Sequence, residues 1–434
     1  MPEMSSRINR SPIGVAPTRF SSLAARANSF TARAALSFCI AIKSISGIVS
    51  TTAPSLAILT LTSMAAAGCD FGYSPPDSWT HYKLAQQLLQ AGNYKEAIKE
   101  YKTFISEDPS NPLAPYAQFD IAQIYHWKLK DYQNAIAEYR IFIQKYPAEA
   151  QASDAQFYIA QIYDFGLKDY QNAIAEYRKF VQNYPGSPVA SNAQYRIAQI
   201  YDEELKDYPN AIVEYRKFIQ NYPDSPFAPD AQYEIAIIYD VELHDYLNAI
   251  AEYRKMVQNY SGSFAASTSQ LRIAWIYEEK LNDYPSAITE YRKFVQNYPN
   301  DNRVPYAQFR IATIYDDELN DYQNAIVEYR KFVQNYPNDN NAPYAQYRIA
   351  EIYFANLGDY PNAITEFRKV VQNYPNYSRA DEAQHWLTQI YDYFLNDYPN
   401  AVAEYKNLIQ NYPDSPFVPD AKERLKELCD MGYC

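Results

Sequence analysis

The chain is poor in glycine, histidine and cysteine, and each shortage argues against a class of structure or site. Ten of its 434 residues are glycine, which argues against flexible linkers, and neither a glycine-rich phosphate loop nor a G-x-S-x-G turn occurs. The four histidines lie far apart and lack the spacing of metal ligands: His81, His126, His244 and His385. We therefore expect neither an enzyme nor a bound metal or cofactor.

Positive charge is also scarce outside the N-terminal segment. The formal net charge is −12, yet residues 1–68 hold six basic residues against Glu3 alone. This balance of +5 leaves −17 for residues 69–434. Nucleic-acid binding needs a cationic surface that faces phosphates, so we expect no nucleic-acid partner. An acidic body is better suited to basic segments of other proteins.

What the chain does have is a repeat of 38 residues. The tyrosine that opens motifs of the type Y-x-N-A-I-x-E-Y-R-K-F recurs at this constant step: Tyr94, Tyr132, Tyr170, Tyr208, Tyr246, Tyr284, Tyr322, Tyr360 and Tyr398. A second tyrosine keeps the same step and is followed by proline in every copy except Tyr260-Ser261. A fixed period of this size indicates a stacked array in which each unit buries its apolar face against its neighbours.

One repeat, residues 191–223, has the pattern of two helices. Apolar side chains recur at helical spacing in its first half: Ile197, Ala198, Ile200, Tyr201 and Leu205. Asp207 can then cap a second helix, and Pro209 fits the first turn of that helix. The second half again places apolar residues on one face: Ala211, Ile212, Tyr215, Phe218, Ile219 and Tyr222. We expect two antiparallel helices in each repeat.

This pattern resembles the tetratricopeptide repeat, whose signature positions map onto Ile197, Ala198, Tyr201, Tyr208, Ala211, Tyr215 and Pro223. The resemblance covers residues 78–413. The family unit has about 34 residues, so each repeat after the first adds one residue near Leu205 and about three in the following loop. The resemblance implies an all-α fold, a right-handed superhelical solenoid of nine antiparallel helix pairs, with a capping helix and tail over residues 414–434. It also implies a non-enzymatic scaffold for protein–protein interaction.

The lengthened repeats look like those of BamD-type outer-membrane assembly lipoproteins and of the periplasmic protein associated with the Tol–Pal system. Residues 1–68 have the layout of a secretory signal, with a basic region, an apolar run and small residues. Ala66-Ala67-Gly68-Cys69 resembles the bacterial lipobox, which implies a lipid anchor at Cys69, a tether over residues 69–77 and a periplasm-facing lipoprotein of the cell envelope. A cleaved signal without lipid, an organellar transit peptide and a transmembrane anchor remain open, so the protein could also be secreted or organellar.

The first helices vary mostly at positions expected to face an inner groove. An aromatic floor and acidic helix ends form the expected partner-binding surface: Phe119, Trp127, Phe157, Tyr195, Asp202, Glu203, Tyr233, Asp240, Trp275, Glu278, Glu279, Phe309, Asp316, Asp317, Tyr347, Phe354 and His385. Acids in a last helical turn oppose the helix dipole, so docking of basic or aromatic protein segments would explain them. Solvated helix ends, and rings partly buried between helices, are the alternatives.

The second helices are nearly identical to one another. Pairs on them such as Glu214 and Lys217 are expected on a solvated outer face, where each contributes about 0.5 kcal/mol. An aromatic floor also suits sugar rings, so a carbohydrate-binding envelope protein is a second hypothesis, and a structural spacer of end-to-end arrays is a third. Cys429 and Cys434 either pair with each other or remain apart.

Overall fold

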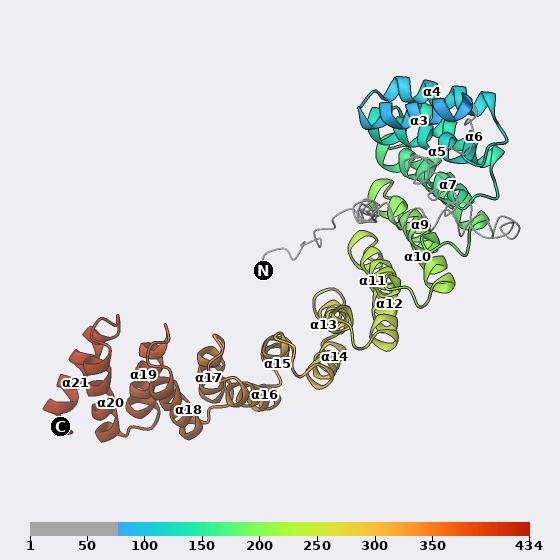
Figure 1. Cartoon of the computed structure of the whole chain (residues 1–434). Helices are drawn as coiled ribbons and strands as arrows, with labels where there is room; N and C mark the ends of the chain where they lie inside the picture. The colour runs from blue at the N-terminus through green and yellow to red at the C-terminus, as the bar shows by residue number, and fades with distance from the viewer. Residues whose placement is uncertain (1–76) are drawn as a thin grey trace, which may run out of the picture. The chain divides into compact units, whose positions relative to one another are not determined.

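The computed structural model describes residues 77–434, and the regular structure in that range is helical. The described residues divide into two compact units, 77–149 and 150–434. Figure 1 shows their helices. The first unit contains α3 (Asp77–Gln90), α4 (Tyr94–Glu107), α5 (Ala114–Gln123) with its π-helical extension η1 (Ile124–Leu129), and α6 (Tyr132–Lys145). Within this unit α3 packs on α4, α4 on α5, and α5 on α6.

The second unit continues the alternation of first and second helices. Its α-helices are α7 (Gln151–Gln161), α8 (Tyr170–Asn183), α9 (Ala190–Gln199), α10 (Tyr208–Asn221), α11 (Ala228–Ile237), α12 (Tyr246–Asn259), α13 (Phe264–Glu279), α14 (Tyr284–Asn297), α15 (Val304–Thr313), α16 (Tyr322–Asn335), α17 (Ala342–Glu351), α18 (Tyr360–Asn373), α19 (Ala380–Gln389), α20 (Tyr398–Asn411) and α21 (Val418–Asp430). Each helix packs on the next one along the chain. The expectation of an all-α array of helix pairs is confirmed.

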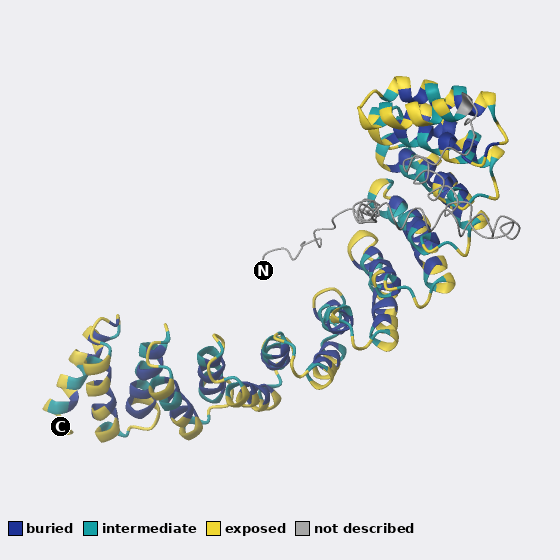
Figure 2. Ribbon diagram, in the orientation of Figure 1, coloured by how far each residue is buried: buried dark blue, intermediate teal, exposed yellow. Residues whose placement is uncertain are grey.

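From α6 onward, the second helix of each pair starts with a capping aspartate and packs in a similar way, whereas α4 starts after Asn93 without a side-chain cap. In α10 the Asp207 carboxylate accepts hydrogen bonds from the backbone N–H of Asn210 at 3.3 Å and from its side-chain amide at 2.7 Å. Ala211, Tyr215 and Phe218 then turn inward and are fully buried. Figure 2 shows the buried stripe facing the neighbouring helices and the exposed stripe facing away. The core of each unit therefore runs between successive helices.

Most first helices end in a π-helical turn, which is where the extra residue near Leu205 is accommodated. In η3 (Ile200–Glu204) the Leu205 N–H donates to the Ile200 carbonyl at 3.0 Å, five residues back. Lys206 follows in the left-handed region, with φ of 54°. The same extension occurs in η2 (Ile162–Gly166), η4 (Ile238–Glu242), η5 (Ile314–Glu318), η6 (Ile352–Asn356) and η7 (Ile390–Phe394). A π turn absorbs one added residue without ending the helix.

The described chain ends in α21, and a disulfide joins Cys429 to Cys434. Gly432, with φ of 91°, allows the turn between the two cysteines. The expected leader (1–68), the lipidated Cys69 and all but the last residue of the tether lie outside the described residues. Between residues 77 and 434, no helix is both long and apolar enough to span a bilayer.

Candidate functional site

Three of the acids expected in the groove are buried inside the second unit. Asp240, Glu278 and Asp316 expose 2%, 4% and 2% of their surface. The Asp316 carboxylate accepts hydrogen bonds from Arg348 of the next pair, at 2.9 Å from Nε and 2.8 Å from Nη2, and one from Tyr329 Oη at 3.2 Å. The prediction that these three acids dock a partner's cations is wrong, because arginines of the chain itself already bind them.

This three-residue contact, which we call the Tyr–Asp–Arg latch, recurs at five joints between neighbouring repeats. Its members are Tyr177, Asp164 and Arg196; Tyr253, Asp240 and Arg272; Tyr291, Glu278 and Arg310; Tyr329, Asp316 and Arg348; and Tyr405, Asp392 and Arg424. A paired guanidinium offsets the cost of an acid in the last helical turn. Burial and the charge of Asp316 raise the pKa of Tyr329, so its hydroxyl stays protonated and donates.

The joint between the α9/α10 and α11/α12 pairs departs from this composition. Glu234 stands at the position that arginine occupies in the five latches. Asp202, one of the expected groove acids, is half-buried there and accepts a hydrogen bond from Tyr215 Oη at 3.4 Å. Asp202 therefore also takes part in the contacts that hold the helices of the array together.

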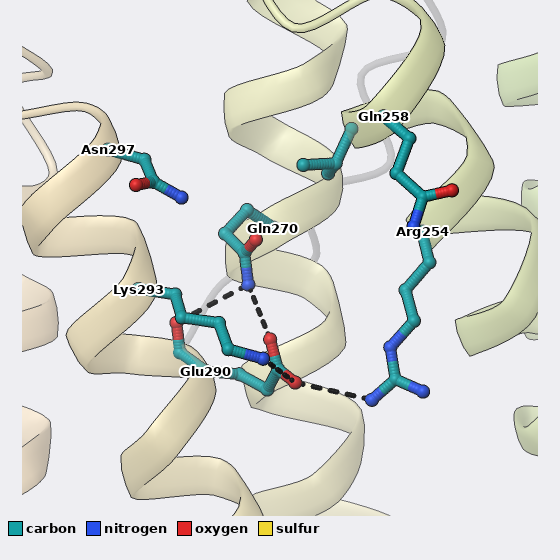
Figure 3. A pocket seen from close by; sticks show the side chains of 7 residues that line it. Arg254, Gln258, Gln270, Glu290, Lys293 and Asn297 are labelled. Atoms are coloured by element: carbon teal, nitrogen blue, oxygen red, sulfur yellow. Dashed lines mark hydrogen bonds and ion pairs between the residues drawn. The ribbon is translucent and has the colours of Figure 1, made fainter.

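The acids of the second helices are buried as well. Glu290 accepts from Gln270 Nε2 at 2.7 Å, from Lys293 Nζ at 3.0 Å and from Arg254 Nη2 at 3.2 Å (Figure 3). Burial alone would raise the pKa of Glu290, but these hydrogen bonds outweigh it and lower the pKa. The side chains line a shallow hollow of about 310 Å³ among α12, α13 and α14. The hollow lies at the contact between two repeats, where the Glu290 carboxylate is already paired with side chains of the chain itself.

The expectation of a solvated Glu214–Lys217 pair is wrong for Glu214, which is 4% exposed. Its carboxylate accepts from Arg178 at 2.7 Å, from Gln194 at 2.9 Å and from Lys217 at 3.0 Å. The Gln194 contact is buried, and a hydrogen bond to a charged group contributes about 1.5–3 kcal/mol. Arg178 and Lys217 are about half exposed, so their contacts contribute closer to what a solvated pair does. These contacts help to lock adjacent repeats together.

The side chains of the expected aromatic floor pack largely against other side chains of the helix array. Tyr195 and Tyr347 are 5% and 0% exposed, so neither can contact a partner without rearrangement, and their expected place on the groove surface is wrong. The half-buried members lie against other rings: Phe119 on Phe142, Phe157 on Phe180, Tyr233 on Tyr253, Phe309 on Phe332 and His385 on Phe417. Trp275, also half-buried, has Arg272 and Lys280 at 4.0 and 5.0 Å from its ring. The alternative of rings partly buried between helices fits these positions.

The side chains one residue beyond the latch acid reach the surface, and three of them, Glu203, Glu279 and Asp317, are among the residues expected in the groove. In the second unit this set consists of Phe165, Glu203, Val241, Glu279, Asp317, Ala355 and Tyr393, which we call the helix-end column. Glu203 is half-buried, and the other six are exposed. Trp127 holds the equivalent position in the first unit, where it is 53% exposed and stacks on His126. An acidic middle between apolar ends therefore persists, although with fewer acids than expected.

One joint of the second unit replaces the latch with aromatic side chains. Phe354, Phe367 and Trp386 stand at the positions of the acid, the tyrosine and the arginine. The rings of Phe354 and Trp386 lie 4.8 Å apart. Phe354 was expected in the groove and is half-buried, whereas Trp386 was not expected to contribute. The three positions change together in the sequence, and this simultaneous change could have identified Trp386 as part of the site.

No ligand chemistry of another kind emerges from residues 77–434. In that range no three histidine, cysteine, aspartate or glutamate side chains gather as metal ligands would. The buried acids are bound by the chain's own cations, amides and hydroxyls, so the helix-end column is the variable, accessible surface that remains as the candidate site.

Two family profiles, both described as tetratricopeptide repeat, match the sequence. One covers residues 82–150, and the other covers 154–187, 192–225, 268–301, 306–339, 344–377 and 382–415. No curated protein matches the chain. Together the two profiles cover more than half of the chain.

Solved structures of similar fold have low sequence identity to this chain. The C-terminal part of a repeat-containing protein from Cytophaga hutchinsonii shares 17% identity over 70% of this chain and 98% of its own, with a TM-score of 0.32. A tetratricopeptide repeat protein from Parabacteroides merdae shares 14% over 70% and 96%, with a TM-score of 0.24. YrrB, described as having an unusual peptide-binding site, shares 18% over 48% and 97%, with a TM-score of 0.30. These similarities carry no functional argument, but the profile matches establish that the chain belongs to the tetratricopeptide repeat family.

Proposed function

We propose that this protein is a non-enzymatic scaffold that binds a segment of a partner protein along the helix-end column. The observation that carries the proposal is a division of roles between positions. Side chains that join repeats recur with little change, whereas the exposed residue beyond each latch varies from aromatic through acidic to aliphatic. Packing needs the first set, and recognition of a particular partner needs variation of the second kind.

The chemistry of the column indicates the kind of partner. Glu203, Glu279 and Asp317 are its acidic members, and their charge favours lysine or arginine on the partner. Phe165 and Tyr393, 53% and 56% exposed, offer ring surface at its two ends. A segment with a basic centre and apolar ends would fit this order.

The proposal extends to a membrane tether. The lipobox-like Ala66-Ala67-Gly68-Cys69 and the lengthened repeats together support a lipid anchor at Cys69 in a bacterial envelope, with a role in envelope or outer-membrane assembly. Intact-mass analysis of the protein purified from its native envelope tests this part. A diacyl or triacyl mass on Cys69 is the expected result, and an unlipidated N-terminus at another residue contradicts it.

Charge reversal tests the binding surface. Glu203, Glu279 and Asp317, each changed to lysine, should weaken capture of the native partners at least tenfold, because long-range attraction and local pairing are both reversed. A matched control changes three exposed acids elsewhere, Asp224, Asp414 and Glu423, by the same total charge.

Partner capture is measured by affinity purification from the native envelope with quantitative mass spectrometry. The control should retain the partners that the first variant loses. Equal retention by both variants, or equal loss, would contradict a binding role for the helix-end column.

A further inference from the structure

The second unit carries a cluster of rings at the joint between the α17/α18 and α19/α20 pairs. It consists of Phe354, Tyr360, Trp386 and Phe394, and we call it the C-terminal aromatic patch. Phe394 lies 5.2 Å from Phe354 and 5.0 Å from Tyr360, measured between ring centres. Phe394 exposes 45% of its surface, and the other three are half-buried. The patch is therefore partly packed and partly open.

Packing between repeats does not require these rings, because other joints are held by polar contacts at the same positions. Phe354 and Trp386 stand where the neighbouring joint has the Asp316–Arg348 pair. Phe394 stands where an earlier repeat has Glu242, which accepts from Tyr208 at 2.7 Å.

Two polar links are thus exchanged for ring contacts at one joint, and the exchange leaves apolar surface in contact with water. Contiguous exposed apolar surface of this kind marks interaction sites in soluble proteins.

The charge of the adjoining turns indicates what would cover the patch. The left-handed residue of an earlier turn is Lys206, but at the patch the equivalent residues are Gly358 and Asn396. The aspartates that cap the next helices, Asp359 and Asp397, are kept. The turns beside the rings carry these aspartates with no cation at the left-handed position, as the turns with Asn282 and Asn320 also do, and an acidic turn complements a cationic segment.

We propose that the C-terminal aromatic patch anchors a partner-protein segment bearing an aromatic or aliphatic side chain flanked by lysine or arginine. The inference rests on the proposed scaffold function and names the anchoring point of the partner. The apolar side chain packs on the exposed faces of Trp386 and Phe394, and the flanking cations lie toward Asp359 and Asp397. Arginine also stacks on rings, as Arg196 does on Phe165 at 5.0 Å in this chain.

Equivalent positions in other repeats show which substitutions would remove the patch and keep the fold. The triple change Phe354→Asp, Phe367→Tyr and Trp386→Arg converts this joint to the latch composition found at five others. A second variant, Phe394→Glu, installs the residue found at positions 204, 242 and 318. The control is Phe264→Asn, because Phe264 is 77% exposed at the start of α13, outside the patch, and asparagine occupies the equivalent positions 302 and 340.

The probe is a random dodecapeptide library displayed on phage and selected for binding to the full-length parent protein. Selected peptides are then synthesised, and their affinities are measured by fluorescence anisotropy. We expect a shared aromatic or aliphatic residue with flanking lysine or arginine. Binding should be at least tenfold weaker for the triple variant and for Phe394→Glu, and unchanged for Phe264→Asn.

Other outcomes overturn the inference. Peptides that bind parent and variants alike, peptides without the basic and apolar pattern, or the absence of any selected peptide would each do so. Vesicles of phosphatidylglycerol and phosphatidylethanolamine that bind the parent but not Phe394→Glu would identify a membrane surface instead. A parent dimer in sedimentation that the triple variant abolishes would identify a second copy of the chain.

Failure of this inference can be told apart from failure of the scaffold function. If the patch variants capture native partners as the parent does while reversal of Glu203, Glu279 and Asp317 abolishes capture, the anchor is wrong and the scaffold stands. If neither set of changes affects capture, the scaffold function fails with it.

Discussion

Removing one member of a latch should weaken a single joint of the array, and the joint at Asp316 offers the sharpest case. Arg348→Met keeps most of the side-chain length but removes the two hydrogen bonds, at 2.9 and 2.8 Å, that neutralise the Asp316 carboxylate, and a more exposed one to Glu351 at 2.6 Å. The side chain of Asp316 is 0% exposed, and that of Arg348 is 21% exposed. Leaving a buried charge without its partner costs about 3–5 kcal/mol. Because Arg348 is partly solvated and Tyr329 still donates, we expect about 3 kcal/mol.

The natural joint at Phe354 provides the compensating variant. Asp316→Phe, Tyr329→Phe and Arg348→Trp together copy its composition, so no buried charge remains, and we expect a cost within about 1 kcal/mol of zero. In a repeat array the loss stays local, since stability is a sum over repeats and their interfaces. Native-state hydrogen exchange of the α15–α18 segments is therefore the assay, and 3 kcal/mol corresponds to exchange about a hundredfold faster. The reasoning fails if Arg348→Met exchanges like the parent, or if the triple variant is as unprotected as the single one.

Three further predictions concern single positions. Lys206 has φ of 54°, where the equivalent residue of a later repeat is Gly358, so Lys206→Gly should raise the stability of its joint by about 0.5–1 kcal/mol in urea unfolding, and a loss would contradict the strain. Cys434→Ser opens a short disulfide loop, so the free energy that protects the amides of α21 from exchange should fall by up to about 2 kcal/mol, with the other helices unchanged. Unchanged exchange in α21 would mean that the disulfide does not stabilise this helix. Burial raises the pKa of Asp120 to about 6; its raised folded-state pKa means that the proton favours folding, and stability is lost as pH rises from about 4 toward 6. Calorimetry should therefore show a melting-temperature gain for Asp120→Asn that grows from pH 4 to pH 7, and a pH-independent difference would refute it.

The repeat itself could be predicted from the sequence, because its 38-residue period, capping aspartates and apolar spacing all point to the same helix pairs. The faces of the helix ends could not. Each α-helical residue turns the chain by about 100°, so a residue added in a π turn rotates every later side chain by a similar angle. The sequence alone does not tell which of two neighbouring residues faces the groove after such a turn, so both Asp316 and Asp317 were expected there, whereas the structure buries Asp316 and exposes Asp317. The pairing of an acid with an arginine 32 residues later was present in the sequence, but it identifies a contact only once adjacent repeats are known to stack.

The same contacts change what the acidic composition means. A charge of −17 on residues 69–434 suggested a broad acidic surface for cationic partners. Many of these carboxylates, however, lie in latches or in buried contacts between repeats like that of Glu290. Acids that are already paired attract a partner weakly, so the exposed Asp317 counts for more than the net charge, and Glu279, 3.6 Å from Arg310, counts for less than Asp317. Variation at the helix-end column costs the joints between repeats little, because the buried latch side chains lie at other positions, and column residues that contact a latch arginine, such as Phe165 and Glu279, do so at the surface. A scaffold built in this way can change its partner by substitutions at the column and at the C-terminal aromatic patch while the joints between its other repeats stay as they are.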